Sequence, residues 1–160
     1  MAAKKNSGNN KTVKTIRKIL LPTDFSTVSE DAAAYALMLA RLNKARVYVL
    51  HVVDTSHEAA GFYLPHLSYE KLDKDLKSVA AEMLAKFTAR MFKGYGNVER
   101  HVLAGEPSKE ILKVVKGASA DMVVMGTYGK EGIDRFFFGS TTERVMRKAG
   151  CPVLVVPPSK

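Results

Sequence analysis

The 160-residue sequence contains a single cysteine, Cys151, no tryptophan and no long apolar run. One cysteine excludes an internal disulfide framework and is typical of proteins kept in a reducing compartment. No apolar stretch approaches the roughly 18 residues that a transmembrane helix needs. The amino terminus is polar and basic and lacks the apolar region of a secretory signal. We therefore expect a cytoplasmic protein that does not span a membrane.

Acidic residues are missing from the first 18 positions, which carry six of the 25 lysines and arginines. The rest of the chain has 19 basic against 16 acidic residues, so most of the formal net charge of +9 lies in this leader. We predict a disordered basic leader over 1–15 and a single domain over 16–160. A basic arm can hold polyanions weakly, but a solvated tail is the simpler interpretation, and we do not expect nucleic-acid binding.

Apolar runs alternate with helical patterns along the remainder of the chain. Strands are predicted at 16–22, 46–54, 98–105, 121–126 and 152–157, and helices at 29–43, 68–92, 107–118 and 140–148; residues 55–67 read as a loop. Nearly continuous apolar strands between helices predict an α/β fold, a Rossmann-like open parallel five-stranded sheet with helices on both faces. Ligands of such sheets bind beyond the carboxyl ends of the strands, where the strand order reverses.

The two standard phosphate-binding motifs are absent. The sequence has no G-x-x-x-x-G-K-[ST] run, and G-x-G-x-x-G does not follow the first strand. The stretch "MGTYGKEGIDRFFFGSTTERV" nevertheless places Gly126 and Gly129 after the fourth strand and Gly139 before a helix. Ser140 followed by Glu143 is a capping-box pattern, which predicts Ser140 as the N-cap. A helix start of this kind can bind an anion, although the glycines could equally shape an ordinary surface loop.

The spacing Gly126-x2-Gly129-x9-Gly139-Ser140 resembles the G-x2-G-x9-G-[ST] motif of the ATP-binding universal stress protein family. Further segments are similar to that family: "KILLPTDFS", "VLHVVD", "GEPSKEIL", "ADMVVMGTYG" and "GSTTERVMRKAGCPVLVV". The resemblance extends over about residues 16–157 and implies a nucleotide-dependent regulatory protein of the stress response. It also implies a homodimer that pairs through the C-terminal strand, 152–157.

The resemblance implies a site for ATP, or for ADP or AMP, with Mg²⁺ or Mn²⁺ held mainly by the phosphates rather than by protein ligands. The nucleoside side is implied for Pro22, Thr23, Asp24, Val52 (through its backbone), Met125 and Gly126. The phosphate side is implied for Gly129, Gly139, Ser140 and Thr141, and loop position adds Lys130. No metal-ligating residues are expected.

Two features depart from the family pattern. Tyr128 stands where the family often has histidine, so it could change a contact on the phosphate side or simply cover the ligand. Phe136, Phe137 and Phe138 replace a leucine-like run, and we expect them to pack the loop down or to contact a partner subunit. Arg135 is a second candidate phosphate partner beside Lys130.

Two other functions compete with a nucleotide-dependent regulator. An interaction protein of the same fold that binds no nucleotide would lack the glycines that are present here. An ATP-hydrolysing enzyme would need a general base or an activated nucleophile, and the sequence shows neither in a suitable place. We therefore expect no catalytic residues and at most slow hydrolysis. The sequence does not indicate the stress or the protein partner.

Overall fold

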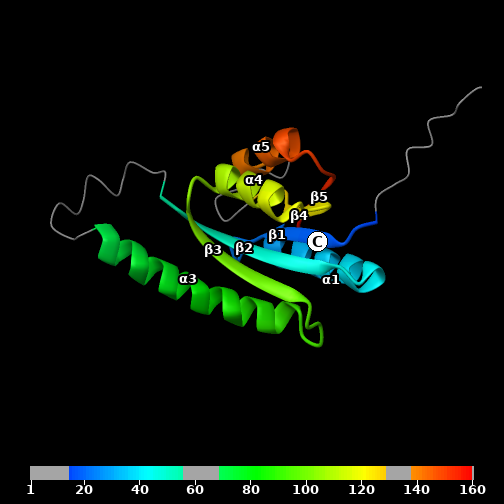
Figure 1. Cartoon of the computed structure of the whole chain (residues 1–160), viewed down its shortest axis with the longest axis horizontal. Helices are drawn as coiled ribbons and strands as arrows, with labels where there is room; N and C mark the ends of the chain where they lie inside the picture. Colours follow the sequence, from blue (N-terminus) through cyan, green and yellow to red (C-terminus); the bar gives the residue numbers. More distant parts are fainter. Residues whose placement is uncertain (1–14, 56–68, 129–137, 160) are drawn as a thin grey trace, which may run out of the picture.

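The computed structural model describes residues 15–55, 69–128 and 138–159. Its described strands form one parallel sheet in the order β3-β2-β1-β4-β5. Figure 1 shows α4 and α5 on one side of this sheet and α1 and α3 on the other. The elements are β1 (Lys18–Pro22), α1 (Thr27–Asn43), β2 (Arg46–Asp54), α3 (Tyr69–Met91), β3 (Val98–Gly105), α4 (Pro107–Ala118), β4 (Met122–Gly126), α5 (Ser140–Lys148) and β5 (Val153–Val156). The predicted fold class is confirmed.

The central strand β1 is apolar along its length because both of its faces are covered. Ile19, Leu20 and Leu21 are completely buried. Successive side chains of a strand point to opposite faces, and Ile19 and Leu21 belong to one core cluster whereas Leu20 belongs to the other. A parallel sheet between two helical layers therefore selects a continuous apolar run here.

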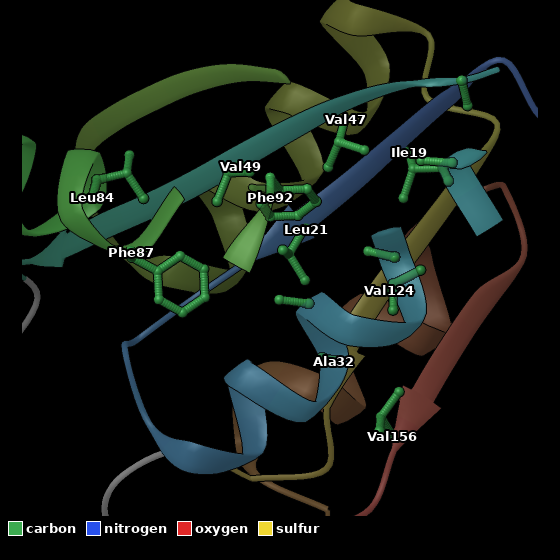
Figure 2. Packing of buried hydrophobic residues seen from close by; sticks show 14 residues of the cluster. Ile19, Leu21, Ala32, Val47, Val49, Leu84, Phe87, Phe92, Val124 and Val156 are labelled. Atoms are coloured by element: carbon green, nitrogen blue, oxygen red, sulfur yellow. The ribbon is translucent and has the colours of Figure 1, made fainter. Parts of the chain in front are cut away.

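The core on the α1 and α3 side depends on small residues of α1. Ala32, Ala33, Ala36 and Ala40 are completely buried, so α1 can lie close to the sheet. Figure 2 shows this core with the labelled side chains of the strands, of α3 and of Phe92, which directly follows α3, around Ala32: Ile19, Leu21, Val47, Val49, Leu84, Phe87, Phe92, Val124 and Val156. On the opposite face, α4 and α5 contribute Ile111, Val115 and Val145.

The strand order reverses at β1. The chain runs outward from β1 through β2 to β3 and then returns to β4 and β5 on the other side of β1. The carboxyl ends of β1 and β4 are therefore neighbours. The helices that follow them, α1 and α5, lie on opposite faces of the sheet (Figure 1). A crevice at this point is the usual ligand position in an open parallel sheet.

Two element starts differ from the prediction by two residues. The strand predicted from residue 16 begins at Lys18, because the backbone N–H groups of Arg17 and Lys18 both donate to Asp121 Oδ2, at 2.9 and 3.0 Å. The helix predicted from residue 29 begins at Thr27, since Ser26 is the N-cap and its hydroxyl accepts from Ser29 N at 3.2 Å.

Some predictions lie outside the described residues. These are the basic leader (apart from residue 15) and the loop at 55–67 beyond Thr55. Within the described part of the chain, no helix is both long and apolar enough to cross a bilayer.

Candidate functional site

A cavity of about 550 Å³ opens at the carboxyl ends of β1, β2 and β4. This volume lies within the usual range for small-molecule sites. Nine of the eleven residues named from the sequence line it: Pro22, Thr23, Asp24, Val52, Met125, Gly126, Gly139, Ser140 and Thr141. The other two, Gly129 and Lys130, lie outside the described residues. The structure thus brings together residues that come from four separate parts of the chain.

The turn after β1 is held by its own polar side chains. Thr23 Oγ1 shares a hydrogen bond of 2.9 Å with Ser29 Oγ and accepts one of 3.0 Å from Phe25 N. Asp24 Oδ1 accepts from both the N–H and the hydroxyl of Ser26, at 3.0 and 2.6 Å. These local bonds replace the bonds of the strand that has ended. They fix the backbone of the turn where it meets the cavity.

The same turn is supported by His51 of β2. Its Nδ1 donates to the carbonyl oxygen of Thr23 at 2.8 Å, and its ring lies 4.4 Å from the ring of Phe25, centroid to centroid. Phe25 has a φ of 63°, in the left-handed region that a bulky residue rarely occupies. The contacts of Thr23 and Phe25 with His51 thus hold an unfavourable backbone conformation beside the cavity.

Gly126, the last residue of β4, is required by close packing rather than by its own φ. A Cβ atom at this position would lie 2.7 Å from Val28 Cγ1, in the first turn of α1. The carbonyl oxygen of Gly126 accepts from Thr142 Oγ1 at 3.0 Å. Gly126 therefore lets α1 approach β4 and also anchors α5.

The two ends of the glycine-rich segment meet next to β4. Gly139 N donates to Thr127 O at 2.8 Å, and Thr127 N donates to Val156 O of β5 at 3.0 Å. Phe138 belongs to the aromatic run that we expected to pack the loop down or to contact a partner subunit. In the single chain, 52% of its surface is exposed. Phe136 and Phe137 lie outside the described residues, as does Arg135. The residue that follows β4 and the residue that precedes α5 are therefore joined by a backbone hydrogen bond.

Ser140 is the first helical residue of α5, so the prediction that it is the N-cap is wrong. The N-cap is Gly139, whose carbonyl oxygen accepts the first helical hydrogen bond from Glu143 N at 3.0 Å, and no side chain caps the helix. The capping-box pattern places the N-cap at Ser140. The hydrogen bond from Gly139 N to Thr127 O instead fixes Gly139 as the extended N-cap residue, one position earlier. The Ser140 side chain lines the cavity instead.

The cavity is lined by both apolar and polar residues. Tyr128, singled out from the sequence as a residue that could contact or cover the ligand, also lines it. The lining residues that sequence reasoning missed are Ser29, Leu50, Asp54, Pro107, Ile111 and Thr142. Pro107 and Ile111 come from α4, which crosses the sheet from the edge strand β3 back to β4. The signal that could have found them is this crossover, which must pass over the point of strand reversal.

Electrostatic attraction for an anion comes from the backbone here. Among the described residues, the lining contains no lysine, arginine or histidine side chain. The first N–H groups of α5 have no partner within the helix, and the helix dipole makes this end partly positive. The described part of the chain also has no group of three or more residues suited to hold a metal ion. The described lining therefore offers an anion the start of α5, while the carboxylates in the lining, Asp24 and Asp54, belong to the turn after β1 and to the end of β2.

Residues 15–157 match the universal stress protein family. Universal stress protein MJ0531 of Methanocaldococcus jannaschii is 40% identical over 146 residues, which cover 90% of this chain and 84% of the relative. The solved structure of MJ0577 from the same organism has a TM-score of 0.80 and 28% identity, covering 92% of this chain and 99% of that one.

A solved universal stress protein from Archaeoglobus fulgidus in complex with dAMP has the same fold, with a TM-score of 0.62 and 23% identity over 89% of this chain and 99% of that one. The match to the family covers most of the chain, and the first of these relatives extends over a similar range. The chain belongs to the universal stress protein family.

Proposed function

We propose that the cavity binds an adenine nucleotide, with ATP as the expected ligand, and that the protein is a nucleotide-dependent regulator of a stress response. The observation that carries the proposal is the arrangement of the cavity, whose apolar residues lie beside the amino-terminal end of α5. An apolar wall suits a purine ring, and a helix start suits phosphate. The dAMP complex of the Archaeoglobus fulgidus protein supports the ligand class.

The proposed nucleoside side is formed by the ends of β1, β2 and β4. Leu50, Val52 and Met125 offer apolar surface, and the backbone of Val52 is available to the edge of a base. Pro22 ends β1, Thr23 and Asp24 follow it in the turn, and Gly126 ends the neighbouring strand β4. The turn is already held by its internal hydrogen bonds, so binding would cost little ordering of the chain.

The proposed phosphate side is the start of α5. Gly139, Ser140 and Thr141 line the cavity there, and the hydroxyls of Ser140 and Thr141 can donate in addition to the backbone. We assign Gly129 and Lys130 to the same side from their place in the sequence. Mg²⁺ or Mn²⁺ would be held mainly by the phosphates, as is usual for nucleotide-bound magnesium.

The protein is further proposed to act as a homodimer or through a protein partner. β5 is an edge strand that pairs with β4 along one side. An apolar edge strand needs to be covered, and Val153, Leu154 and Val155 are only half-buried in the single chain. A second copy pairing along β5 would cover this edge.

Nucleotide retention tests the proposal directly. The chain has no tryptophan, so bound adenine would raise the absorbance of the purified protein near 260 nm, and boiling would release it for chromatography. Calorimetry with ATP, ADP and AMP then ranks the ligands. If the purified protein carries no adenine nucleotide and calorimetry shows no binding, the chain is an interaction protein of the same fold. Release of ADP from ATP over hours would indicate slow hydrolysis.

A charge variant tests where the phosphates bind. Ser140→Asp places a carboxylate at the start of α5 and should abolish ATP binding, while the fold is retained because an acidic residue is favourable in the first turn of a helix. Ser78→Asp adds the same charge on an exposed position of α3, away from the cavity, and should leave binding unchanged. Full ATP affinity in Ser140→Asp would show that the phosphates lie elsewhere.

A further inference from the structure

The helices α4 and α5 both begin at the cavity, and an ion pair joins them near these ends. Pro107 and Ile111 of α4 and Ser140 of α5 line the cavity. Directly before Pro107 lies Glu106, whose Oε1 accepts a hydrogen bond from Arg144 Nη1 at 2.6 Å. Arg144 follows Ser140 by four residues and so lies one turn further along the same face of α5.

Glu106 is held firmly in this position. Its Oε1 also accepts from Ser108 Oγ at 2.8 Å, and its Oε2 pairs with Lys109 Nζ at 2.7 Å. Its side chain is 23% exposed, against 59% for Arg144. The hydrogen bonds from Lys109 and Ser108 lower the pKa of Glu106 to about 2, so the carboxylate stays charged at neutral pH. The fixed partner of the pair is therefore Glu106, and Arg144 reaches across to it.

The side chain of Glu106 does not cap α4, although the residue stands at the N-cap position. Acceptor side chains at an N-cap normally bond to the first turn of their own helix. Here Oε1 accepts from Arg144 of the neighbouring helix as well as from the Ser108 side chain of its own first turn, which ties the starts of α4 and α5 together.

The remaining polar contacts at the start of α5 lie on its other side. Thr142 Oγ1 donates to Gly126 O, and Gly139 N donates to Thr127 O, so both contacts fix the helix to the end of β4 and the residue that follows it. The helix has only nine residues. Besides the core packing of Val145, its position is therefore held by polar contacts with β4 on one side and with Glu106 on the other.

We propose that Glu106 and Arg144 are positioning residues, whose ion pair places the amino-terminal end of α5 at the distance from the nucleoside pocket that a phosphorylated nucleotide requires. Neither residue lines the cavity, so the pair acts through the position of the helix. The inference rests on the proposed function. It predicts a selective effect, because a displaced α5 weakens contacts with phosphate but leaves the nucleoside pocket in place.

A direct role of Arg144 in binding phosphate makes a different prediction. If Arg144 bound the ligand, removing the charge of Glu106 would release the guanidinium toward the phosphates and strengthen ATP binding. If the pair positions α5, Glu106→Gln and Arg144→Ala should both weaken ATP binding. The two single variants therefore separate the two roles.

The experiment measures the affinities for ATP and for adenosine by calorimetry, together with the melting temperature. Arg144→Ala and Glu106→Gln should each weaken ATP binding roughly tenfold, which is modest for a misplaced contact, and change adenosine binding much less. Arg144→Lys, which retains the charge, should recover most of the ATP affinity. Arg147→Ala removes an exposed ion pair with Glu143 on the same helix, at 2.9 Å, and should change neither affinity.

Three results would overturn the inference. The first is an unchanged ratio of ATP to adenosine affinity in Arg144→Ala, the second is tighter ATP binding in Glu106→Gln, and the third is an equal loss in Arg147→Ala. In each of these cases the unaltered protein still binds ATP, so the proposed function stands. If the unaltered protein binds neither ligand, the proposed function fails and the inference fails with it.

Discussion

Gly126→Ala should destabilise the protein because the new methyl group meets α1. The added Cβ would lie 2.7 Å from Val28 Cγ1, which is closer than carbon atoms can approach, and Val28 is 4% exposed. Val28 is β-branched and cannot easily rotate away. Overpacking of this kind costs about 1–3 kcal/mol, while replacing glycine in a strand returns about 0.5–1 kcal/mol. We expect a net loss of about 1 kcal/mol, and at most about 2.5 kcal/mol, in urea denaturation.

A second substitution tests the cause of that loss. In a Val28→Ala background the nearest atoms to the new Cβ are those of the Val28 backbone and its Cβ, at 3.4 Å. Gly126→Ala should then be neutral or slightly stabilising. The coupling energy between the two positions is the overpacking cost, about 1–3 kcal/mol. Gly117→Ala is the matched control, because no atom lies within 4 Å of its added Cβ in α4, and it should stabilise by about 0.5–1 kcal/mol. An equal loss for Gly126→Ala in both backgrounds would refute the reasoning.

Three further substitutions test the remaining contacts. Asp121→Ala removes the acceptor of two backbone N–H groups that lead into β1, and we expect a loss of about 1–2 kcal/mol in urea denaturation; no change would mean that water replaces the carboxylate. Tyr95→Phe removes a hydroxyl that donates to two backbone carbonyls at the end of α1, and the free energy of unfolding should fall by about 0.5–1.5 kcal/mol. Glu106→Gln should lower the melting temperature at neutral pH. Because folding lowers the pKa of Glu106 from 4.5 to about 2, its stabilising effect is present above pH 4.5 and is lost as the pH falls toward 2. The difference in melting temperature between the variant and the unaltered protein should therefore shrink below pH 4.5, and a constant difference would contradict the assignment.

The secondary structure could largely be predicted because its signals are local. Apolar runs, and for β3 an alternating pattern, identified every strand of the described sheet, and α4 and α5 have the predicted bounds of 107–118 and 140–148. Two of the errors occurred where a contact distant in sequence decides a boundary. Asp121 shifts the start of β1, and the bond from Gly139 N to Thr127 O moves the cap of α5 by one residue.

The cavity could be predicted where its residues lie at the carboxyl ends of strands or at the start of α5. The ends of β1, β2 and β4 are expected ligand positions in a parallel sheet, and the resemblance to the family named Asp24, Val52 and Gly126 at those ends and Ser140 at the helix start. The α4 residues Pro107 and Ile111 could not be placed without the strand order, which carries no local signal in the sequence. The pairing of Glu106 with Arg144, 38 residues apart, depends on how two helices lie together and appears in no motif.

The central claim is that ATP binds with its phosphates at the start of α5 and its base at the end of β2. Titration of ATP into isotopically labelled protein, followed by the backbone amide resonances, tests both ends of the ligand at once. The largest shifts should occur at Ser140 and Thr141 on one side and at Val52 and Gly126 on the other, and adenosine should shift only the second group. Shifts confined to the basic residues of the amino-terminal leader, or none at all, would contradict the proposed function.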